Sequence, residues 1–326
     1  MEIRPVDLPI LRDETRRDVA EYCPLVYEAA IEQGVQHWKP ELPPKQAAAY
    51  MVTAECQRLD KAELFYVSAG MTELAKVATA SMPDFNLMPE DLPAKYGFLF
   101  FDNPIDVVTS TTWGGTERTP IVAVCWGAWD DGPPGWAHGG VWITWYSDRD
   151  GMLSTGNGAF DKKTIEWYKR YRSRLILDNE SPQPFSPEAL RIFNSTSGEI
   201  ESFPEAIADG QSIIEWVGIL KTTWLLMGQT LASDEVAKYD RAARRRIERR
   251  GQEPPPVRVI SLRRHASTPG DGDGREYQHQ WIVKGHWRQQ WYPSRGVHRP
   301  VWIAPHIKGP EGAPLLGGEK VYAWTR

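Results

Sequence analysis

The chain has few of the residues and motifs that mark common disulfide, metal and hydrolase sites. Its three cysteines, Cys23, Cys56 and Cys125, are odd in number and widely spaced, and no CxxC pair occurs. This pattern argues against a disulfide framework or a cysteine-based zinc site and is consistent with a reducing cytoplasm. The sequence also lacks GxSxG and HExxH, so neither a nucleophile elbow nor a zinc-protease helix is indicated.

Long hydrophobic runs are missing as well. The most apolar helical stretch, residues 213–227, contains Glu215 and Lys221, and it is shorter than the roughly 20 residues that span a bilayer. The N-terminal stretch has acidic residues early and no long apolar core, unlike a signal peptide. We therefore expect a cytoplasmic protein that makes no membrane contact.

Histidine is sparse, with seven residues in the chain. Four of them lie near the C-terminus at spacings of 7, 12 and 8 residues, which match no zinc signature: His279, His286, His298 and His306. Acidic ligands are scarce in the same region. We expect neither a metal nor another cofactor.

Tryptophan is abundant, with 15 residues, and most of these side chains should be buried. Charge is unevenly distributed. From Ala237 to the end, 18 Lys and Arg stand against 8 Asp and Glu, whereas the preceding residues carry 20 against 35. This asymmetry indicates a C-terminal part that binds polyanions, or two parts that attract each other within one fold.

Hydrophobic periodicity predicts an α+β protein. Helices are expected at residues 12–34, 45–59, 72–80, 161–177, 211–228 and 234–250, and strands at 62–69, 96–102, 120–129, 140–147 and 257–264. Residues 178–187 are polar and predict a loop. The strands favour an antiparallel sheet with helices on one side.

These elements predict three parts of the chain. Residues 1–228 would form an acidic scaffold of helices and antiparallel sheet that could also bind a protein partner. Residues 229–256 would hold an Arg-rich helix and a Pro-rich connector, and residues 257–326 a small, basic antiparallel β domain.

The clearest alternation runs from residue 281 to residue 308. Odd positions from Trp281 to Trp291 are mostly apolar, whereas even positions carry Lys284, His286 and Arg288. Successive strand side chains point to opposite faces, so a cationic row should face solvent. After a turn at residues 293–296, a second run places Val301, Ile303 and Ile307 on one side and Trp302, His306 and Lys308 on the other. Pro305 suggests that this second strand is bulged or at an edge.

The cationic row predicts a nucleic-acid-binding surface, with DNA or RNA left open. Lysine and arginine neutralise phosphates, and exposed aromatic rings stack bases. The residues expected to contact nucleic acid are Lys284, Arg288, Tyr292, Arg295, Trp302 and Lys308, together with Arg241, Arg244 and Arg245 of the Arg-rich helix. A solvated sheet face and a solvated helix are the alternatives that call for no ligand.

Two further functions fit the same residues. A metal-independent ribonuclease, toxin-like in character, would use His286 and His306 as base and acid, with Arg288 stabilising the phosphorane. It requires both imidazoles within the span of one phosphate. A non-catalytic interaction module would instead bury the basic face against the acidic part or a partner.

Two other clusters carry weaker signals. Asp130, Asp131, His138, Asp148 and Asp150 surround one expected hairpin and could serve a hydrolase, although turn chemistry explains the aspartates equally well. Residues 151–158 (GMLSTGNG) vaguely resemble a phosphate loop but lack the Lys-Ser/Thr ending, which favours a simple turn.

Three segments carry a resemblance to other sequences: AELFYVSAGMTELAKVATASMPDFNLMPEDLP, RAARRRIERRG and GHWRQQWYPSRGVHRPVWIAPHIKGPEGAPL. They resemble uncharacterised proteins of actinobacteria, their plasmids and their phages, over most of the chain. The resemblance implies a bacterial cytoplasmic setting, an association with mobile elements, and a role in replication, defence or toxicity. It assigns a function to no residue.

Overall fold

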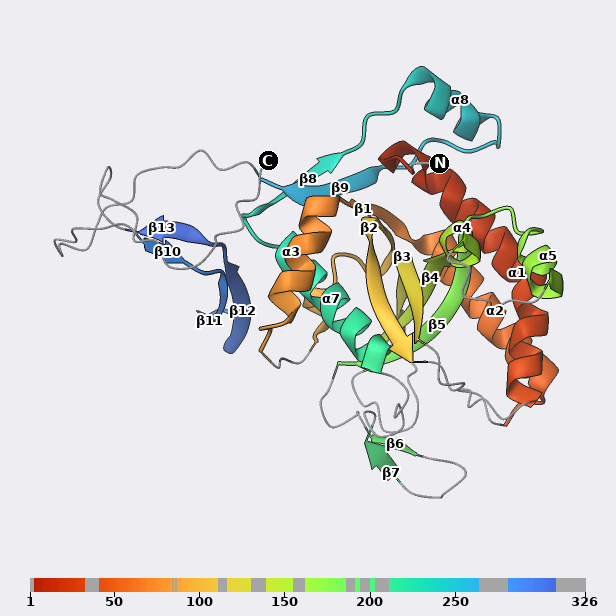
Figure 1. Cartoon of the computed structure of the whole chain (residues 1–326), viewed down its shortest axis with the longest axis horizontal. Helices are drawn as coiled ribbons and strands as arrows, with labels where there is room; N and C mark the ends of the chain where they lie inside the picture. The colour runs from red at the N-terminus through yellow and green to blue at the C-terminus, as the bar shows by residue number, and fades with distance from the viewer. Residues whose placement is uncertain are drawn as a thin grey trace.

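A seven-stranded mixed β-sheet organises the chain in this computed structural model (Figure 1). The structure describes residues 3–32, 41–83, 85, 87–110, 116–129, 139–154, 162–185, 191–193, 200–202, 211–263 and 281–308. The strand order is β5-β4-β3-β2-β1-β9-β8, with bounds β1 Glu63–Val67, β2 Tyr96–Ser110, β3 Thr116–Trp129, β4 Gly140–Asp148, β5 Leu175–Pro184, β8 Ala232–Val236 and β9 Val257–Leu262.

The sheet is mixed rather than purely antiparallel. Strand β1 runs parallel to both β2 and β9, whereas all other neighbours in the sheet are antiparallel. The α+β class expected from the sequence is confirmed.

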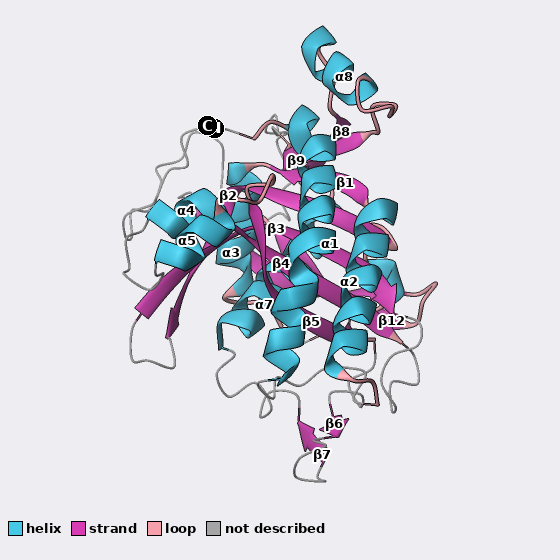
Figure 2. Cartoon of the chain, turned by 90° about the vertical axis from the view of Figure 1, so that its right-hand side faces the viewer, coloured by secondary structure: helices cyan, strands magenta, loops and turns pink. Residues whose placement is uncertain are grey.

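Helices cover both faces of the sheet, so the expectation of helices on one side was wrong. Helices α1 (Leu8–Glu32) and α2 (Pro44–Lys61) lie on one face, as Figure 2 shows, and α3 (Ala69–Thr79) and α7 (Gln211–Met227) lie on the other. Each pair buries its own apolar cluster against the sheet. The α1/α2 cluster contains Leu8, Leu59 and Phe98, and the α3/α7 cluster contains Phe65 and Trp224.

Local sequence signals explain most helix positions. The apolar spacing of α7 buries Val217, Leu220 and Trp224, as that stripe predicts. Helix α3 begins earlier than expected, because the Ser68 hydroxyl accepts a hydrogen bond from the Met71 amide at 3.4 Å. Thr72 is therefore buried within the first turns instead of capping the helix.

Two expected elements between residues 161 and 187 were wrong. The helix predicted over 161–177 is only α5 (Lys162–Tyr168), and the predicted polar loop at 178–187 is largely the outer strand β5. This strand contains Pro182 and Pro184, which an edge strand tolerates because one side of it needs no ladder hydrogen bonds.

The boundaries expected at residues 228 and 257 do not separate sheets. Strands β8 and β9 both belong to the central sheet, with β9 paired to β1. The expected helix 234–250 is a strand followed by α8 (Arg241–Glu248), where Asp240 accepts a hydrogen bond from the Ala243 amide at 2.7 Å. Asp234 and Glu235 lie in β8 and do not start this helix.

The C-terminal part is a two-stranded antiparallel ribbon in two segments. Strand β11 (His286–Tyr292) pairs with β12 (Val297–Ile303), and β10 (Trp281–Val283) pairs with β13 (His306–Lys308). Figure 1 shows the ribbon beside α3 and α7, on the side away from α1 and α2. The smaller elements are η1 Pro5–Asp7, η2 Pro89–Asp91, α4 Arg149–Ser154, β6 Arg191–Phe193 and β7 Ile200–Ser202.

None of the helices in the described ranges combines the length and the apolar character needed to cross a bilayer.

Candidate nucleic-acid interface

The ribbon forms the expected hairpin around residues 293–296. The register pairs His286 with Ile303 and Tyr292 with Val297. The Gly296 amide donates to the Tyr292 carbonyl at 2.9 Å, and Gly296 has a φ of 64°, a left-handed conformation that glycine adopts at little cost. The turn therefore fixes which side chains of the two strands are neighbours.

A break divides the ribbon at Gly285 and Pro305. A Cβ atom on Gly285 would lie 2.5 Å from the ring of Trp302, so any other residue would collide with that indole. Pro305 follows the end of β12, and pairing resumes at His306. Pro305 was expected to mark a bulged or edge strand, and the structure instead ends β12 before it and begins β13 after it. Glycine is needed at position 285 because Trp302 packs directly over the backbone.

Two tryptophans dock the ribbon on the body. The Trp287 indole N–H donates to the Ala78 carbonyl at 2.8 Å, near the end of α3. Trp302 is 5% exposed, its backbone amide donates to Gln229 Oε1 at 3.1 Å, and its ring meets that of Trp287 edge to face at 5.3 Å between centroids. This pair anchors β11 and β12 in the same core that α3 and α7 form.

An ion pair provides a second anchor. Arg299 of β12 lies 3.2 Å from the carboxylate of Asp91, and both side chains are largely buried. Burial raises the pKa of Asp91, against the lowering effect of a Met88 backbone hydrogen bond and of Arg299. The ribbon is thus held by apolar packing and by a charge contact on another element.

The burial of Trp302 corrects one expected role. We expected Trp302 on the exposed side of its strand, where it would stack a base. Directly opposed residues of an antiparallel pair share a face, and Trp302 is opposite Trp287. Trp302 therefore packs in the core, and Val301 and Ile303 lie beside Arg288 and His286 instead.

The cationic row itself is exposed. Lys284, His286 and Arg288 all face solvent, as do Tyr292 and Arg295. Arg288 donates to the Gln290 side chain at 2.8 Å, and within the described residues Lys284, Arg288 and Arg295 form no ion pair. These cations keep their charge available for an anionic ligand.

The two histidines of the ribonuclease hypothesis lie on different segments of the ribbon. His286 is opposite Ile303 in one segment, and His306 is opposite Val283 in the other. Three residues along each strand separate these pairs, which corresponds to about 10 Å. Nδ1 of each ring lies 3.1 Å from the backbone carbonyl two residues earlier. The register therefore does not place the two imidazoles at the same or neighbouring residue pairs of the ribbon. The side chain of Lys308, another residue expected to bind nucleic acid, lies outside the described residues.

The Arg-rich helix α8 divides its arginines between two environments. Arg246 lies 2.6 Å from Asp7 and Arg250 lies 2.7 Å from Glu14, so these two hold the helix to the N-terminal segment. On the inner face of the same helix, Ala243 and Ile247 are fully buried. The three arginines expected to bind phosphate, Arg241, Arg244 and Arg245, are exposed.

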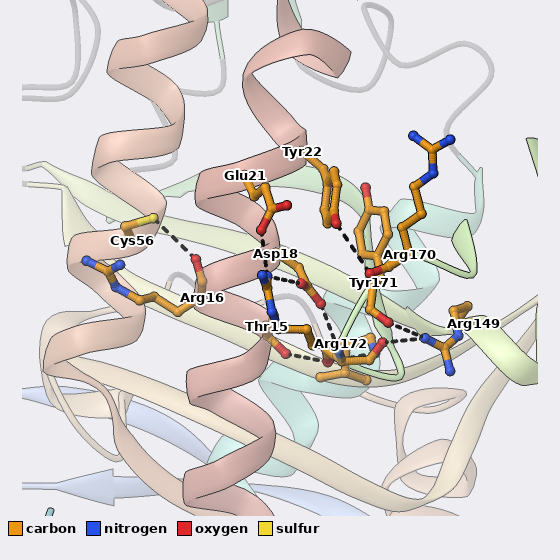
Figure 3. A network of polar contacts seen from close by, with 12 residues as sticks. Thr15, Arg16, Asp18, Glu21, Tyr22, Cys56, Arg149, Arg170, Tyr171 and Arg172 are labelled. Carbon is orange, nitrogen blue, oxygen red and sulfur yellow. Dashed lines mark hydrogen bonds and ion pairs between the residues drawn. The ribbon is translucent and has the colours of Figure 1, made fainter. Parts of the chain in front are cut away.

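Other basic and acidic candidates serve the fold. Figure 3 shows Arg172 between Asp18 at 3.3 Å and Glu21 at 2.6 Å on α1. Asp148 accepts from Arg174 at 2.7 Å, and Asp150 lies 2.9 Å from Arg149. These acids of the hydrolase hypothesis are therefore occupied by arginines, while Asp130, Asp131 and His138 lie outside the described residues. Residues 151–154, the start of the glycine-rich stretch, lie in α4.

Sequence reasoning missed a charged network buried between α2 and the sheet. Glu55 is fully buried and accepts hydrogen bonds from Thr144 at 2.7 Å and from Tyr146, while Arg58 lies 2.7 Å from it. Glu180 of β5 lies 3.6 Å from Arg58, and burial raises its pKa to about 7. The signal was available, because Glu55 falls at helical spacing between Val52 and Leu59, on the buried stripe of α2.

No cluster of three or more His, Cys, Asp or Glu side chains in the described part of the chain is arranged to hold a metal ion. No protein-family model matches the chain. Among curated proteins, none matches its sequence.

Proposed function

We propose that this protein binds nucleic acid through its C-terminal ribbon. The observation that carries the proposal is the exposed row Lys284, His286 and Arg288 on a ribbon whose opposite side is anchored by Trp287 and Trp302. Because the ribbon that carries the row is already docked on the body, binding would cost little conformational entropy for ordering its backbone.

The shape of the ribbon supports this function. A two-stranded antiparallel ribbon fits the major groove of a duplex, and its side chains can equally follow the phosphates of one strand. Arg288 can contact a phosphate through two parallel hydrogen bonds, whereas Lys284 acts as a compact charge. The free cations of the ribbon supply the electrostatic attraction on which most nucleic-acid affinity depends.

The other functions have less support. The ribonuclease needs His286 and His306 around one phosphate, and the register separates them along the ribbon. The interaction module would cover the basic row with the acidic part or with a partner, and the acidic part does not cover it, because the row is exposed. Within the proposal we include a bacterial cytoplasmic setting and an association with mobile elements, which rest on the sequence resemblance and on three unpaired, buried cysteines.

A salt titration tests the proposal. The full chain is titrated with labelled DNA and RNA, single- and double-stranded, at two salt concentrations. We expect affinity to fall steeply with salt, and the triple variant Lys284→Ala/His286→Ala/Arg288→Ala to lower both the affinity and the salt slope, by roughly one unit of slope for each phosphate that is no longer neutralised. The absence of salt-dependent binding to every ligand would refute the function, and unchanged binding by the triple variant would refute its assignment to this row.

A further inference from the structure

The free end of the ribbon exposes two aromatic rings. Trp291 is 45% exposed and Tyr292 is 38% exposed, and they end strand β11 next to the turn. The other tryptophans whose side chains the structure describes are buried or half-buried. Leaving large rings in water forgoes the free energy that their burial would provide. Among the described residues Tyr50 of α2 is also exposed, but two adjacent exposed rings occur only at the end of the ribbon.

Resting on the proposed function, we infer that the end of the ribbon binds unpaired bases and that single-stranded nucleic acid is the preferred ligand. Aromatic rings stack on the faces of bases, which a duplex hides between neighbouring base pairs. Rings beside cations are therefore suited to a strand whose bases are free. Binding in the groove of a duplex would use polar side chains such as the exposed Gln289 at base edges and would leave both rings without a base to stack on.

The cations lie where such a strand would run. His286, Arg288 and Tyr292 all occupy even positions of β11, so their side chains share one face of the strand at intervals of about 7 Å or its multiples, and all three are exposed. Arg295 is exposed in the turn immediately beyond Tyr292. A strand that places phosphates along this row arrives with a base at Tyr292 and meets a further cation at the turn.

Trp291 provides a second platform on the other face of the ribbon end. One side of its ring contacts His298, with centroids 4.8 Å apart and planes at 48°, which restrains the indole. The residue is still 45% exposed, which leaves part of the indole accessible to a base. A single strand that turns over the end of the ribbon can stack one base on each ring, and this path is too sharp for a stiff duplex.

Stacking and charge can be separated by variants. Trp291→Ala and Tyr292→Ala remove one ring each, and Val297→Ala is the matched control because Val297 lies opposite Tyr292, is 37% exposed and carries no ring. Each variant of the full chain is titrated with an oligonucleotide of roughly 12 nucleotides, the same strand with abasic positions, and the corresponding duplex.

We expect the native protein to bind the single strand more tightly than the abasic strand or the duplex. Each ring variant should lose about tenfold in affinity for the single strand, with unchanged duplex binding and unchanged salt slope, whereas Val297→Ala should bind like the native protein. Trp291→Phe should retain most of the affinity, because it keeps a ring.

Two outcomes would overturn the inference and remain distinguishable from failure of the proposed function. If the duplex binds as tightly as the single strand, or if both ring variants bind like the native protein, the end of the ribbon does not select bases, although the ribbon still binds nucleic acid. If no ligand shows salt-dependent binding, the proposed function and the inference fail together.

Discussion

Helix α8 and the C-terminal ribbon are both basic, yet they use their cations differently. In α8 and the turn that follows it, Arg246 and Arg250 pair with Asp7 and Glu14, acids more than two hundred residues away in the sequence. In the ribbon, Arg299 pairs with Asp91, whereas Lys284 and Arg288 face solvent without an ion pair among the described residues. Figure 1 shows the two elements at separate places on the molecule.

A run of basic residues in the sequence therefore does not by itself define a binding surface. Arg246 and Arg250 attach α8 to the acidic N-terminal segment. This is the attraction between basic and acidic parts of one fold, which was one of the two explanations for the uneven charge distribution. The ribbon instead separates its roles, because Trp287, Trp302 and Arg299 dock it while the row of Lys284 and Arg288 stays available.

The largest expected effect comes from removing the apolar anchor of the ribbon. Trp302→Ala would leave a cavity between the ribbon and the ends of α3 and α7, and it should lower the free energy of unfolding by about 3–5 kcal/mol. The shift in urea midpoint measures this. Trp291→Ala, at an exposed position of the same ribbon, is the control and should change stability by about 0.5 kcal/mol or less. Equal losses would mean that the ribbon is not docked through Trp302.

Breaking the charged anchor should cost about 3 kcal/mol. Arg299→Met leaves the Asp91 carboxylate buried without its cation, and adding Asp91→Asn should recover much of the stability. Burial already raises the pKa of Asp91 above its unfolded value, and loss of Arg299 raises it further. Since the folded state then holds the proton more tightly, the deficit of the variant should shrink as pH falls through that raised pKa. A deficit independent of pH, measured by urea unfolding, would contradict this assignment.

The two basic regions should differ in nucleic-acid affinity. The ribbon variant Lys284→Ala/His286→Ala/Arg288→Ala should bind at least about tenfold more weakly, a loss of about 1.4 kcal/mol. The α8 variant Arg241→Ala/Arg244→Ala/Arg245→Ala should lose less, about threefold, because its charges act only at a distance. Fluorescence anisotropy at one fixed salt concentration compares them, and the reverse ranking would transfer the binding surface to α8.

The smallest effect is expected for an anchoring arginine of α8. Arg246→Ala removes a partly exposed ion pair and should cost at most about 1 kcal/mol. Burial raises the pKa of Asp7, but hydrogen bonds from Arg4 and Arg246 outweigh it and hold that pKa below its ordinary value. This stabilisation is therefore present above the ordinary carboxyl pKa, about 3.9, and is lost as pH falls through the folded-state pKa. Thermal melts at pH 7 and pH 3 measure it, with Arg245→Ala as control; a larger effect at the lower pH would contradict the sign.

The sequence predicted the elements whose hydrophobic period is strong. Helix α7 and strand β4 lie close to their expected bounds, because a continuous apolar pattern leaves little choice. Strand β5 was missed because residues 175–177 were assigned to the preceding helix, and the rest of the strand is polar and includes Pro182 and Pro184, which edge strands accept. Strand β8 was assigned to a helix because Asp234 and Glu235 fit a first turn as well as they fit a charged edge strand.

The orientation of Trp287 and the cationic side chains was predicted correctly on β11, whereas the orientation of Trp302 on β12 was predicted wrongly. The alternation of β11 correctly placed Trp287 inward and the cationic row outward. In β12 both faces carry apolar side chains, so alternation alone could not decide between Val301 and Trp302. Trp302 faces the core because it pairs with Trp287 and because its ring packs against Gly285. The spacing of residues within β12 carries no information about either contact.

Photo-crosslinking to a bound single-stranded oligonucleotide, followed by peptide mapping, is the most direct test of nucleic-acid binding by the ribbon. We expect crosslinks at residues 284–298, strongest at Trp291 and Tyr292, and we expect them to disappear at high salt. Crosslinks concentrated in α8 or on the central sheet, with none on the ribbon, would contradict it.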